Sequence, residues 1–218
     1  MLFSNDNGIV ILDNLIRVIQ ENKQYLSDLD GAIGDGDHGI NMNKGFTLCR
    51  TELEKNPGNL AYGLNILSKI LMMKIGGSMG PLYGKFFQAM SKTLDGKEMV
   101  TTDDVRTMFN NALGAIISIS PAKVMDKTLM DSLIPAVESL NNSLNEGKTL
   151  PESLTSMKSA AEAGRDSTKD MVARLGRASR LGERSRGVLD TGAVSCCLIL
   201  CTIADSIIEL TDQDEALK

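Results

Sequence analysis

Three aspartates and four glycines alternate in a short stretch near the amino end, which reads Asp-Gly-Ala-Ile-Gly-Asp-Gly-Asp-His-Gly-Ile-Asn from Asp30 to Asn41. The carboxylates of Asp30, Asp35 and Asp37 repel one another, so a fold that gathers them needs a cation between them. Oxygen ligands without a soft neighbour suit Mg²⁺ or Ca²⁺. Because aspartate and glycine are poor helix formers, we expect a bent loop, followed by a helix start whose amides can bind an anion.

Three well-known loop types do not fit these residues. The stretch Gly34–Gly39 matches the G-x-G-x-x-G pattern of dinucleotide sites, but no strand precedes it and two carboxylates stand where pyrophosphate would lie. An EF-hand counted from Asp35 would need glutamate where Phe46 stands. The segment Gly80–Phe86 has the wrong spacing for a Walker A loop. A structural interpretation stays open beside the metal site, in which the aspartates accept hydrogen bonds from their own backbone.

His38 is the only histidine in the chain, and therefore the only side chain with an unperturbed pKa near neutrality. Three roles remain open for it: a donor to phosphate, a general base, or a residue that caps a helix. A lone histidine is more often structural than catalytic.

Five arginines lie within thirteen residues of an otherwise acidic chain. One interpretation is a solvated surface with Glu183 as an ion-pair partner. The other is an arginine that folds over a transferring phosphate, where its planar donors stabilise the charge on the oxygens. The five are Arg174, Arg177, Arg180, Arg184 and Arg186.

The chain has 218 residues, of which 42% are hydrophobic, so it can bury a substantial core, and we expect one domain over residues 1–218. A net charge of −5 argues against a partner nucleic acid or an anionic membrane. No signal peptide and no apolar stretch near the length of a bilayer is expected. The cysteines at 49, 196, 197 and 201 have no histidine nearby and predict reduced, buried thiols, so we expect a cytoplasmic protein.

Apolar residues recur every three or four positions without sustained strand alternation, which predicts an all-α fold. Pro81 is predicted to be the first residue of a helix, Thr101–Asp104 has the form of a capping box, and Pro135 should kink or divide its helix. Eight helices are expected, over residues 8–24, 38–54, 60–74, from 81 past 90, from 101 past 116, and over 127–145, 151–175 and 191–210.

Four polar segments that contain glycine each end where a predicted helix begins: residues 30–39, 76–80, 118–127 and 176–192. If these helix starts meet at one end of a bundle, their free amides and positive dipole ends form a strong anion site.

Four motifs, in this order along nearly the whole chain, resemble the nucleotide-binding L subunits of dihydroxyacetone kinase. They are Asp30–Met42, Gly76–Gly84, Asp126–Thr128 and Gly176–Ser185. The resemblance implies a barrel of eight antiparallel amphipathic helices that binds ADP or ATP and two Mg²⁺ ions at one end.

The resemblance also implies roles for individual residues. Asp30, Asp35 and Asp37 would ligate the two magnesium ions, and Arg177 would act in catalysis by stabilising the transferring charge. The nucleotide would contact His38, Gly39, Ile40, Asn41, Ser78, Met79, Ser120, Leu129, Arg177, Asp190, Thr191 and Gly192, while Thr128 would line the base pocket.

Members of that family pass phosphate to dihydroxyacetone, which is held by a separate K subunit. In many bacterial members a phosphotransferase-system protein, the M subunit, converts bound ADP to ATP in place. The histidine that binds substrate belongs to the K subunit, so His38 should not have that task. Two alternatives stay open, a non-catalytic nucleotide-binding regulator and an ATP-dependent kinase subunit for another small keto-sugar. The sequence also leaves a homodimer open.

Several positions depart from the family pattern. The usual Gly-His-x-Asp-Pro-Gly turn has lost its histidine and proline in Gly187–Gly192, and the usual Gly-Gly-Ala-Ser-Gly-Pro carries a bulky methionine at Met79. Ser120 stands where glycine is common and Leu129 where methionine is usual. Because the metal loop is intact, we expect magnesium and diphosphate binding to be kept, with the departures acting on nucleotide affinity and exchange.

Overall fold

The computed structural model describes residues 2–216, and this part of the chain is mostly helical, which confirms the all-α prediction. The long helices are α1 (Ile9–Glu21), α2 (Lys23–Ile33), α3 (His38–Lys55), α4 (Leu60–Lys74), α5 (Met79–Leu94), α6 (Thr102–Ile117), α7 (Met130–Asn145), α8 (Leu150–Ser167) and α9 (Thr191–Ala216). Two short 3-10 helices, η1 (Thr168–Asp170) and η2 (Ala178–Ser185), lie between α8 and α9. Strands β1 (Phe3–Ser4) and β2 (Met99–Val100) form a small antiparallel pair.

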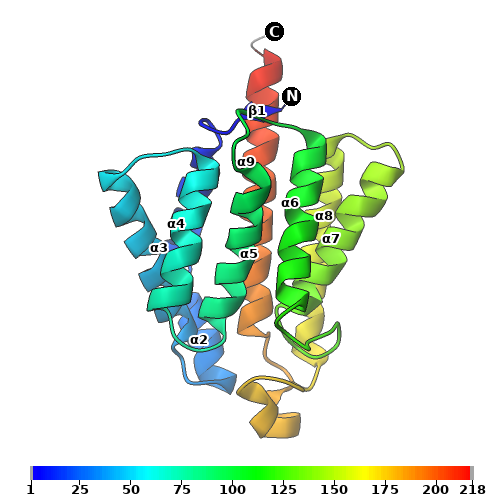
Figure 1. Ribbon diagram of the computed structural model, residues 1–218. Helices are drawn as coiled ribbons and strands as arrows, with labels where there is room; N and C mark the ends of the chain where they lie inside the picture. The colour runs from blue at the N-terminus through cyan, green and yellow to red at the C-terminus, as the bar shows by residue number, and fades with distance from the viewer. Residues whose placement is uncertain (1, 217–218) are drawn as a thin grey trace.

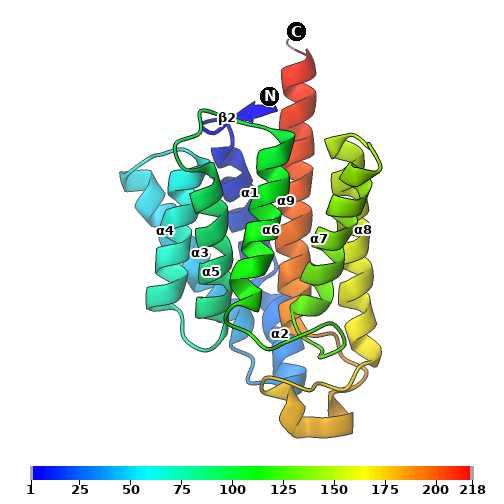
Figure 2. The same ribbon diagram turned by 45° about the vertical axis from the view of Figure 1, so that its right-hand side comes forward.

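Eight of these helices form a closed ring of neighbours. Contacts run from α1 to α3 and then in order through α4, α5, α6, α7, α8 and α9, and α9 returns to α1. Neighbouring helices of the ring run in opposite directions (Figures 1 and 2). The ring is compatible with the predicted barrel. All eight contribute buried side chains to one continuous apolar cluster, as a single domain requires.

Helix α9 packs against α1, α2, α7 and α8. Its segment Thr191–Gln213 is long and apolar enough to cross a bilayer, so the expectation that no stretch approaches this length is wrong. However, 67% of the apolar window is buried inside the fold, and Figure 1 shows α9 running along the other helices. Its apolar character therefore follows from its contacts within the protein.

Helix α2 was not predicted. The predicted helix over residues 8–24 is divided at Asn22, and the chain then forms a second helix that ends at Ile33. Asp30 consequently lies in the last helical turn, and only residues 34–37 form the expected bent loop. Local propensity favoured a loop here, but Leu26 and Ile33 are buried, and this packing outweighs the cost of the polar residues.

Other helix boundaries also differ from the prediction. Pro81 is the third residue of α5 rather than the first, because α5 already begins at Met79. The seventh predicted helix ends at Ser167, well before residue 175. The capping box at Thr101 and Asp104 is confirmed, with each side chain accepting a hydrogen bond from the other residue's backbone N–H.

Pro135 does not divide α7, which runs through it as one helix. Proline has no N–H, so the carbonyl of Asp131 four residues earlier receives no helical hydrogen bond at this point. Helix α8 packs against that carbonyl through Gly164, where a Cβ would lie only 2.0 Å from the Asp131 oxygen. This close approach fixes the start of α7, which carries residues of the candidate site.

We predict opposite effects on stability for two glycine-to-alanine substitutions in helices. Gly164→Ala should destabilise the protein by about 1–3 kcal/mol, because α8 must move away from α7. Gly114→Ala, in α6, should stabilise it by up to about 1 kcal/mol, since nothing lies within 4 Å of the added Cβ. Urea unfolding followed by circular dichroism measures both, and a Gly164→Ala protein as stable as Gly114→Ala would contradict the assigned contact.

Candidate functional site

A cavity of about 360 Å³ opens at the end of the ring where the chain also forms η2, the lower end in Figure 1. Its walls include the first residues of four helices, with His38 from α3, Met79 from α5, Met130 from α7 and Thr191 from α9. Its volume lies in the range of small-molecule sites. Four helix N-termini therefore meet at one cavity, as the predicted anion site requires, and their dipoles favour negative charge there.

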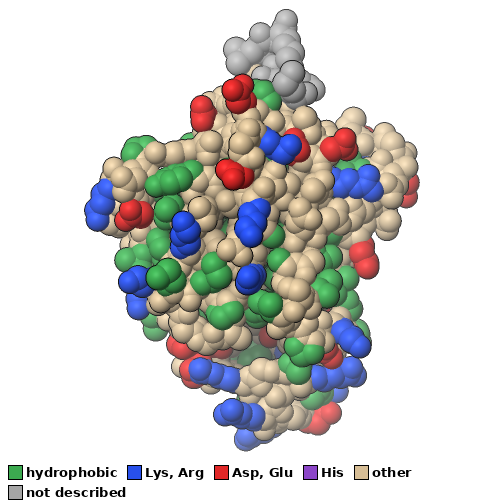
Figure 3. All heavy atoms as spheres, viewed as in Figure 1, with side chains coloured by type: hydrophobic (Ala, Val, Ile, Leu, Met, Phe, Trp, Pro, Cys, Tyr) green, Lys and Arg blue, Asp and Glu red, His purple; other side chains and the backbone are tan. Residues whose placement is uncertain are grey.

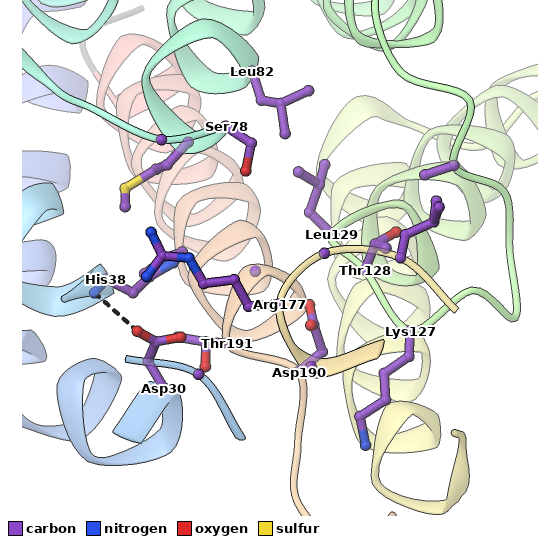
Figure 4. A pocket seen from close by; sticks show the side chains of 18 of the residues that line it. Asp30, His38, Ser78, Leu82, Lys127, Thr128, Leu129, Arg177, Asp190 and Thr191 are labelled. Carbon is purple, nitrogen blue, oxygen red and sulfur yellow. Dashed lines mark hydrogen bonds between the residues drawn. The ribbon is translucent and has the colours of Figure 1, made fainter. Parts of the chain in front are cut away.

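The three aspartates of the metal loop come together at this cavity. One carboxylate oxygen from each of Asp30, Asp35 and Asp37 lies within 4.8 Å of the other two. Asp30 Oδ2 also accepts hydrogen bonds from the backbone N–H of Asp37 at 2.9 Å and of His38 at 3.3 Å (Figure 4). Asp30 is thus compatible with both the metal site and the structural interpretation. Its Oδ2 accepts the two backbone hydrogen bonds at the start of α3, and its Oδ1 is left for a cation.

Glycines are needed where the loop turns around Asp30. A Cβ on Gly34 would lie 2.3 Å from Asp30 Oδ1 and 2.9 Å from its carbonyl oxygen, so any side chain would displace the carboxylate. Gly36 has a φ of +76°, a conformation that L side chains rarely adopt. The Asp-Gly alternation in the sequence therefore has a steric reason.

The donor set fits a hard divalent cation, since it consists of carboxylate oxygens without sulfur or imidazole. Asp35 is well exposed at the edge of the cavity and forms an ion pair with Arg177, whose side chain is 54% exposed. Arg177 lies across the middle of the cavity in Figure 4, near Asp30 and His38. A guanidinium is thus already directed at the carboxylate cluster.

Lys127 is a buried cation that holds the segment carrying Arg177. Only 1% of Lys127 is exposed, and its Nζ donates to the carbonyl oxygens of Met171 at 3.1 Å, Ser185 at 2.7 Å and Val188 at 2.6 Å. These three carbonyls flank Arg177 on both sides in the sequence. Burial lowers the pKa of Lys127, and the nearby carboxylate of Asp190 opposes this shift.

Asp131 shapes the loop that presents Lys127. Its Oδ1 accepts from Met125 N–H at 2.5 Å and its Oδ2 from Thr128 N–H at 2.7 Å. This arrangement holds Met125 and Lys127 at positive φ values of 75° and 59°, a conformation that costs free energy outside glycine. The hydrogen bonds to the buried carboxylate offset that cost.

The start of α9 brings a fourth carboxylate and a hydroxyl to the cavity. Asp190 Oδ2 accepts from Ala193 N–H at 2.7 Å, and burial raises the pKa of Asp190 to about 7. Thr191 Oγ1 is buried and has no hydrogen-bond partner among the described residues. Because an unpaired buried hydroxyl is unfavourable, this atom is available for a ligand.

His38 is held from behind by α9. Its Nε2 lies 2.9 Å from Ser195 Oγ, and burial lowers the pKa of His38 to about 4. The ring is therefore neutral at pH 7. This argues against a role that needs a cationic imidazolium, and it leaves hydrogen bonding by the neutral ring.

Apolar side chains form the side of the cavity opposite Asp30. Leu82 and Leu129 face each other there in Figure 4, while the Nζ of Lys127 points away from both. Met79, Ala122 and Leu175 add further apolar surface. The cavity is therefore divided into a charged half and an apolar half.

The structure brings thirteen of the sixteen predicted site residues to the cavity wall. They are Asp30, Asp35, Asp37, His38, Ser78, Met79, Ser120, Thr128, Leu129, Arg177, Asp190, Thr191 and Gly192. Gly39, Ile40 and Asn41 do not line it. Gly39 instead lets α3 approach α2, with a Cβ that would lie 2.0 Å from the Lys23 carbonyl, and Ile40 is exposed.

Sequence reasoning did not assign Tyr83, Leu82 and Lys127, all of which line the cavity, or Ser195 behind it. Tyr83 and Leu82 read as ordinary members of an apolar helix face. The sequence around Lys127 also gives no sign that this lysine is buried, because the three carbonyls that it binds are 44 to 61 residues away.

We predict that Asp190→Asn changes how stability depends on pH. A carboxyl whose folded pKa is raised stabilises the fold at low pH, and this contribution is lost as pH rises through about 7. The free energy of unfolding of Asp190→Asn, relative to the parent protein, should therefore rise between pH 4 and pH 7, by up to about 4 kcal/mol.

Urea unfolding of metal-free protein at pH 5 and pH 8 measures this change. Asp28→Asn, at an exposed aspartate of α2, is the control. Its free energy of unfolding relative to the parent should be almost the same at pH 5 and pH 8. Parallel pH profiles for Asp190→Asn and the parent would contradict the raised pKa.

The chain is similar to known proteins over most of its length. The family model described as the DAK2 domain matches residues 32–205. The ADP-binding subunit DhaL of the PEP-dependent dihydroxyacetone kinase of Escherichia coli is 36% identical over 191 residues, which cover 86% of this chain and 90% of that protein. The ADP-binding subunit DhaL of the PTS-dependent dihydroxyacetone kinase of Lactococcus lactis is 37% identical over 203 residues, which cover 93% of this chain and 97% of that protein.

A solved structure shows the same fold. The dihydroxyacetone kinase of C. freundii, in complex with AMP-PNP and Mg²⁺, aligns with a TM-score of 0.65 at 23% sequence identity. The alignment covers 94% of this chain and 35% of that one. Together with the match over residues 32–205, these findings confirm the resemblance seen in the sequence motifs: the chain belongs to the DAK2 domain family, and it is similar over most of its length to the ADP-binding subunits of dihydroxyacetone kinases.

Proposed function

We propose that the chain is the nucleotide-binding subunit of a cytoplasmic dihydroxyacetone kinase. The observation that supports this most is the meeting of three carboxylates and four helix N-termini at one cavity. Carboxylates alone would repel a phosphate, and helix starts alone would not hold a cation. A nucleotide with bound magnesium uses both, because the metal joins the two sets of negative charge.

Asp30, Asp35 and Asp37 would hold two Mg²⁺ ions that neutralise the β and γ phosphates of ATP. Asp37 N–H and His38 N–H keep Asp30 in place, which preorganises the site before the metal binds. When bound, the ions supply Lewis-acid polarisation of the phosphoryl oxygens. The phosphates would lie in the charged half of the cavity, with the α9 start and Thr191 nearby.

The base would occupy the apolar half, between Leu82 and Leu129, with Thr128 at its edge. Met79, the first residue of α5, lines the cavity where the family has a small hydroxyl residue, and its bulk would narrow the cavity there. This substitution would alter the rate of nucleotide exchange more than the binding of the diphosphate.

Arg177 would stabilise the charge that develops as the γ-phosphoryl group moves to the acceptor. The acceptor oxygen would bond to phosphorus while the bond to the β-phosphate oxygen breaks, which leaves ADP, and the hydroxyl proton would pass to solvent or to a base of the partner protein. Arg177 and Asp35 are exposed at the cavity edge, so a partner protein can bring dihydroxyacetone to them. That partner would be a K subunit, and an M subunit of the phosphotransferase system would recharge ADP. The two DhaL relatives are named as ADP-binding subunits of a PEP-dependent and a PTS-dependent kinase, which supports a kinase of several subunits.

Two other functions share the same site. A regulator that only binds nucleotide would need the metal loop but no acceptor, and a kinase for another small keto-sugar would differ only in its partner subunit. The exposure of Asp35 and Arg177 favours transfer over regulation, because an acceptor brought by a partner protein can reach an arginine at the cavity edge.

We predict that Asp37→Ala weakens magnesium-dependent ADP binding by at least roughly 100-fold, since it removes a metal ligand. Among the three aspartates, Asp37 is the cleanest target, because Asp30 caps α3 and Asp35 is paired with Arg177. Isothermal titration with ADP and Mg²⁺ measures the affinity, and circular dichroism should remain unchanged. Asp28→Ala is the control. Retained magnesium-dependent binding by Asp37→Ala would exclude the proposed metal site.

We predict that Arg177→Ala lowers kcat by roughly 10²- to 10³-fold while the affinity for ADP changes much less, because the charge it stabilises develops only during transfer. The assay combines the chain with a K subunit and dihydroxyacetone, and supplies either ATP or phosphoenolpyruvate with the phosphotransferase proteins. Arg180→Ala, an exposed arginine outside the cavity wall, is the matched control. Tight nucleotide binding without turnover from either donor would favour the regulator.

A further inference from the structure

A chain of side-chain hydrogen bonds lies behind the cavity wall and joins three helices. His38 Nε2, at the start of α3, is 2.9 Å from Ser195 Oγ in α9, and Ser195 Oγ is 2.6 Å from the hydroxyl of Tyr83 in α5. Both hydroxyls also lie 3.2 Å from the Gly192 carbonyl oxygen. Ser195 is fully buried and Tyr83 is 2% exposed, so water does not substitute for a missing partner.

Counting protons shows which way these hydrogen bonds run. Ser195 and Tyr83 each have one hydroxyl proton, and Gly192 contributes only an acceptor. If His38 Nε2 carries a proton and donates to Ser195, three hydrogen bonds form, and the Gly192 carbonyl receives one of them. If Nε2 instead accepts from Ser195, Tyr83 must donate to Ser195, only two bonds form, and neither hydroxyl serves that carbonyl.

The third arrangement is excluded by distance. If Ser195 donated to His38 while Tyr83 donated to Gly192, the two hydroxyl oxygens would face each other at 2.6 Å with no proton between them. That separation is typical of a short O–H···O hydrogen bond and is too close for two unprotonated lone pairs.

We propose that Ser195 and Tyr83 are positioning residues that fix the tautomer of His38, with the proton on Nε2 and the lone pair of Nδ1 left as an acceptor for an O–H donor of the bound ligand. This inference rests on the proposed nucleotide site only for the ligand; the tautomer is a property of the free protein. The Nδ1 atom has no hydrogen-bond partner among the described residues, and His38 lines the cavity.

The consequence concerns which part of a ligand His38 can bind. A phosphate oxygen is itself an acceptor and cannot pair with an unprotonated Nδ1. The suitable partner has an O–H group, either a hydroxyl of the nucleoside sugar or a water molecule on the cation held by the neighbouring aspartates. Of the three roles left open by the sequence, donation to phosphate is therefore excluded for this tautomer.

The single histidine makes the tautomer directly measurable. In uniformly ¹⁵N-labelled protein at pH 8, where an imidazole is neutral even at its ordinary pKa, a two-bond ¹H–¹⁵N spectrum contains the ring signals of His38 alone. We expect a pyrrole-type shift for Nε2 and a pyridine-type shift for Nδ1. A pyridine-type Nε2 in the free protein would overturn the proposal.

Variants test whether the two hydroxyls are responsible. Ser195→Ala should let both tautomers populate and should weaken MgADP binding by about 3- to 10-fold, as expected for one lost hydrogen bond. Tyr83→Phe should have a smaller effect in the same direction, because it frees the Ser195 proton. Ser153→Ala, which changes an equally buried serine in α8 without a partner among the described residues, and Tyr62→Phe are the matched controls.

A structural role alone would lower the melting temperature without changing the ring shifts. If Ser195→Ala and Tyr83→Phe both keep the parent spectrum, Ser195 and Tyr83 do not set the tautomer and the proposal fails. The ring shifts of His38 in the parent protein test the proposed tautomer even if one of these variants does not fold.

Ligand titration identifies the donor. Addition of MgADP should move the Nδ1 signal upfield while the proton stays on Nε2. Loss of this movement with 2′-deoxy- or 3′-deoxy-ADP assigns the donor to a sugar hydroxyl; its persistence with both analogues and loss without Mg²⁺ assigns it to water on the cation. Transfer of the proton to Nδ1, or bound MgADP that leaves Nδ1 unchanged, would overturn the proposal. Failure of MgADP to bind would instead refute the proposed function.

Discussion

The repulsion among Asp30, Asp35 and Asp37 is the constraint on which the site depends. Three carboxylates within 4.8 Å of one another are unfavourable unless positive charge or hydrogen-bond donors surround them. The fold supplies both, with two backbone amides on Asp30 and a guanidinium on Asp35. These partners reduce the repulsion while leaving oxygens for a cation, so the loop can keep its shape and still bind metal under the proposed function.

The same balance of charge extends to the segment between α8 and α9. Lys127 is buried in a cage of three carbonyls, and its ammonium lies near the carboxylate of Asp190. A buried cation with good hydrogen bonds and a nearby opposite charge is tolerated, whereas removing either partner would leave the other uncompensated. The Lys127 cage thus holds the segment that carries Arg177, while backbone amides at the start of α3 hold the metal loop. Arg177 joins the two parts through its ion pair with Asp35.

Much of this arrangement was readable from the sequence, because it rests on local signals. The helix over residues 60–74, the capping box at Thr101 and the glycine spacing of the metal loop depend on residues close together in the chain. Helix α2, the cage around Lys127 and the Ser195 contact depend on residues far apart, and no local pattern encodes them. Likewise, the sequence placed four helix starts after polar segments, but only the closed ring brings them to one cavity.

Local arrangement also explains how an acidic protein can bind an anionic ligand. With a net charge of −5, the chain as a whole repels phosphate. Because salt screens distant charges, the charges close to the site determine whether an anion binds there. Lysine and arginine side chains gather around the lower end in Figure 3, which is the end of the cavity, among several acidic ones. The helix dipoles act there at short range, and a cation on the aspartates would convert the most negative part of the surface into an attractive one. Magnesium would therefore change the sign of the field that an incoming phosphate meets.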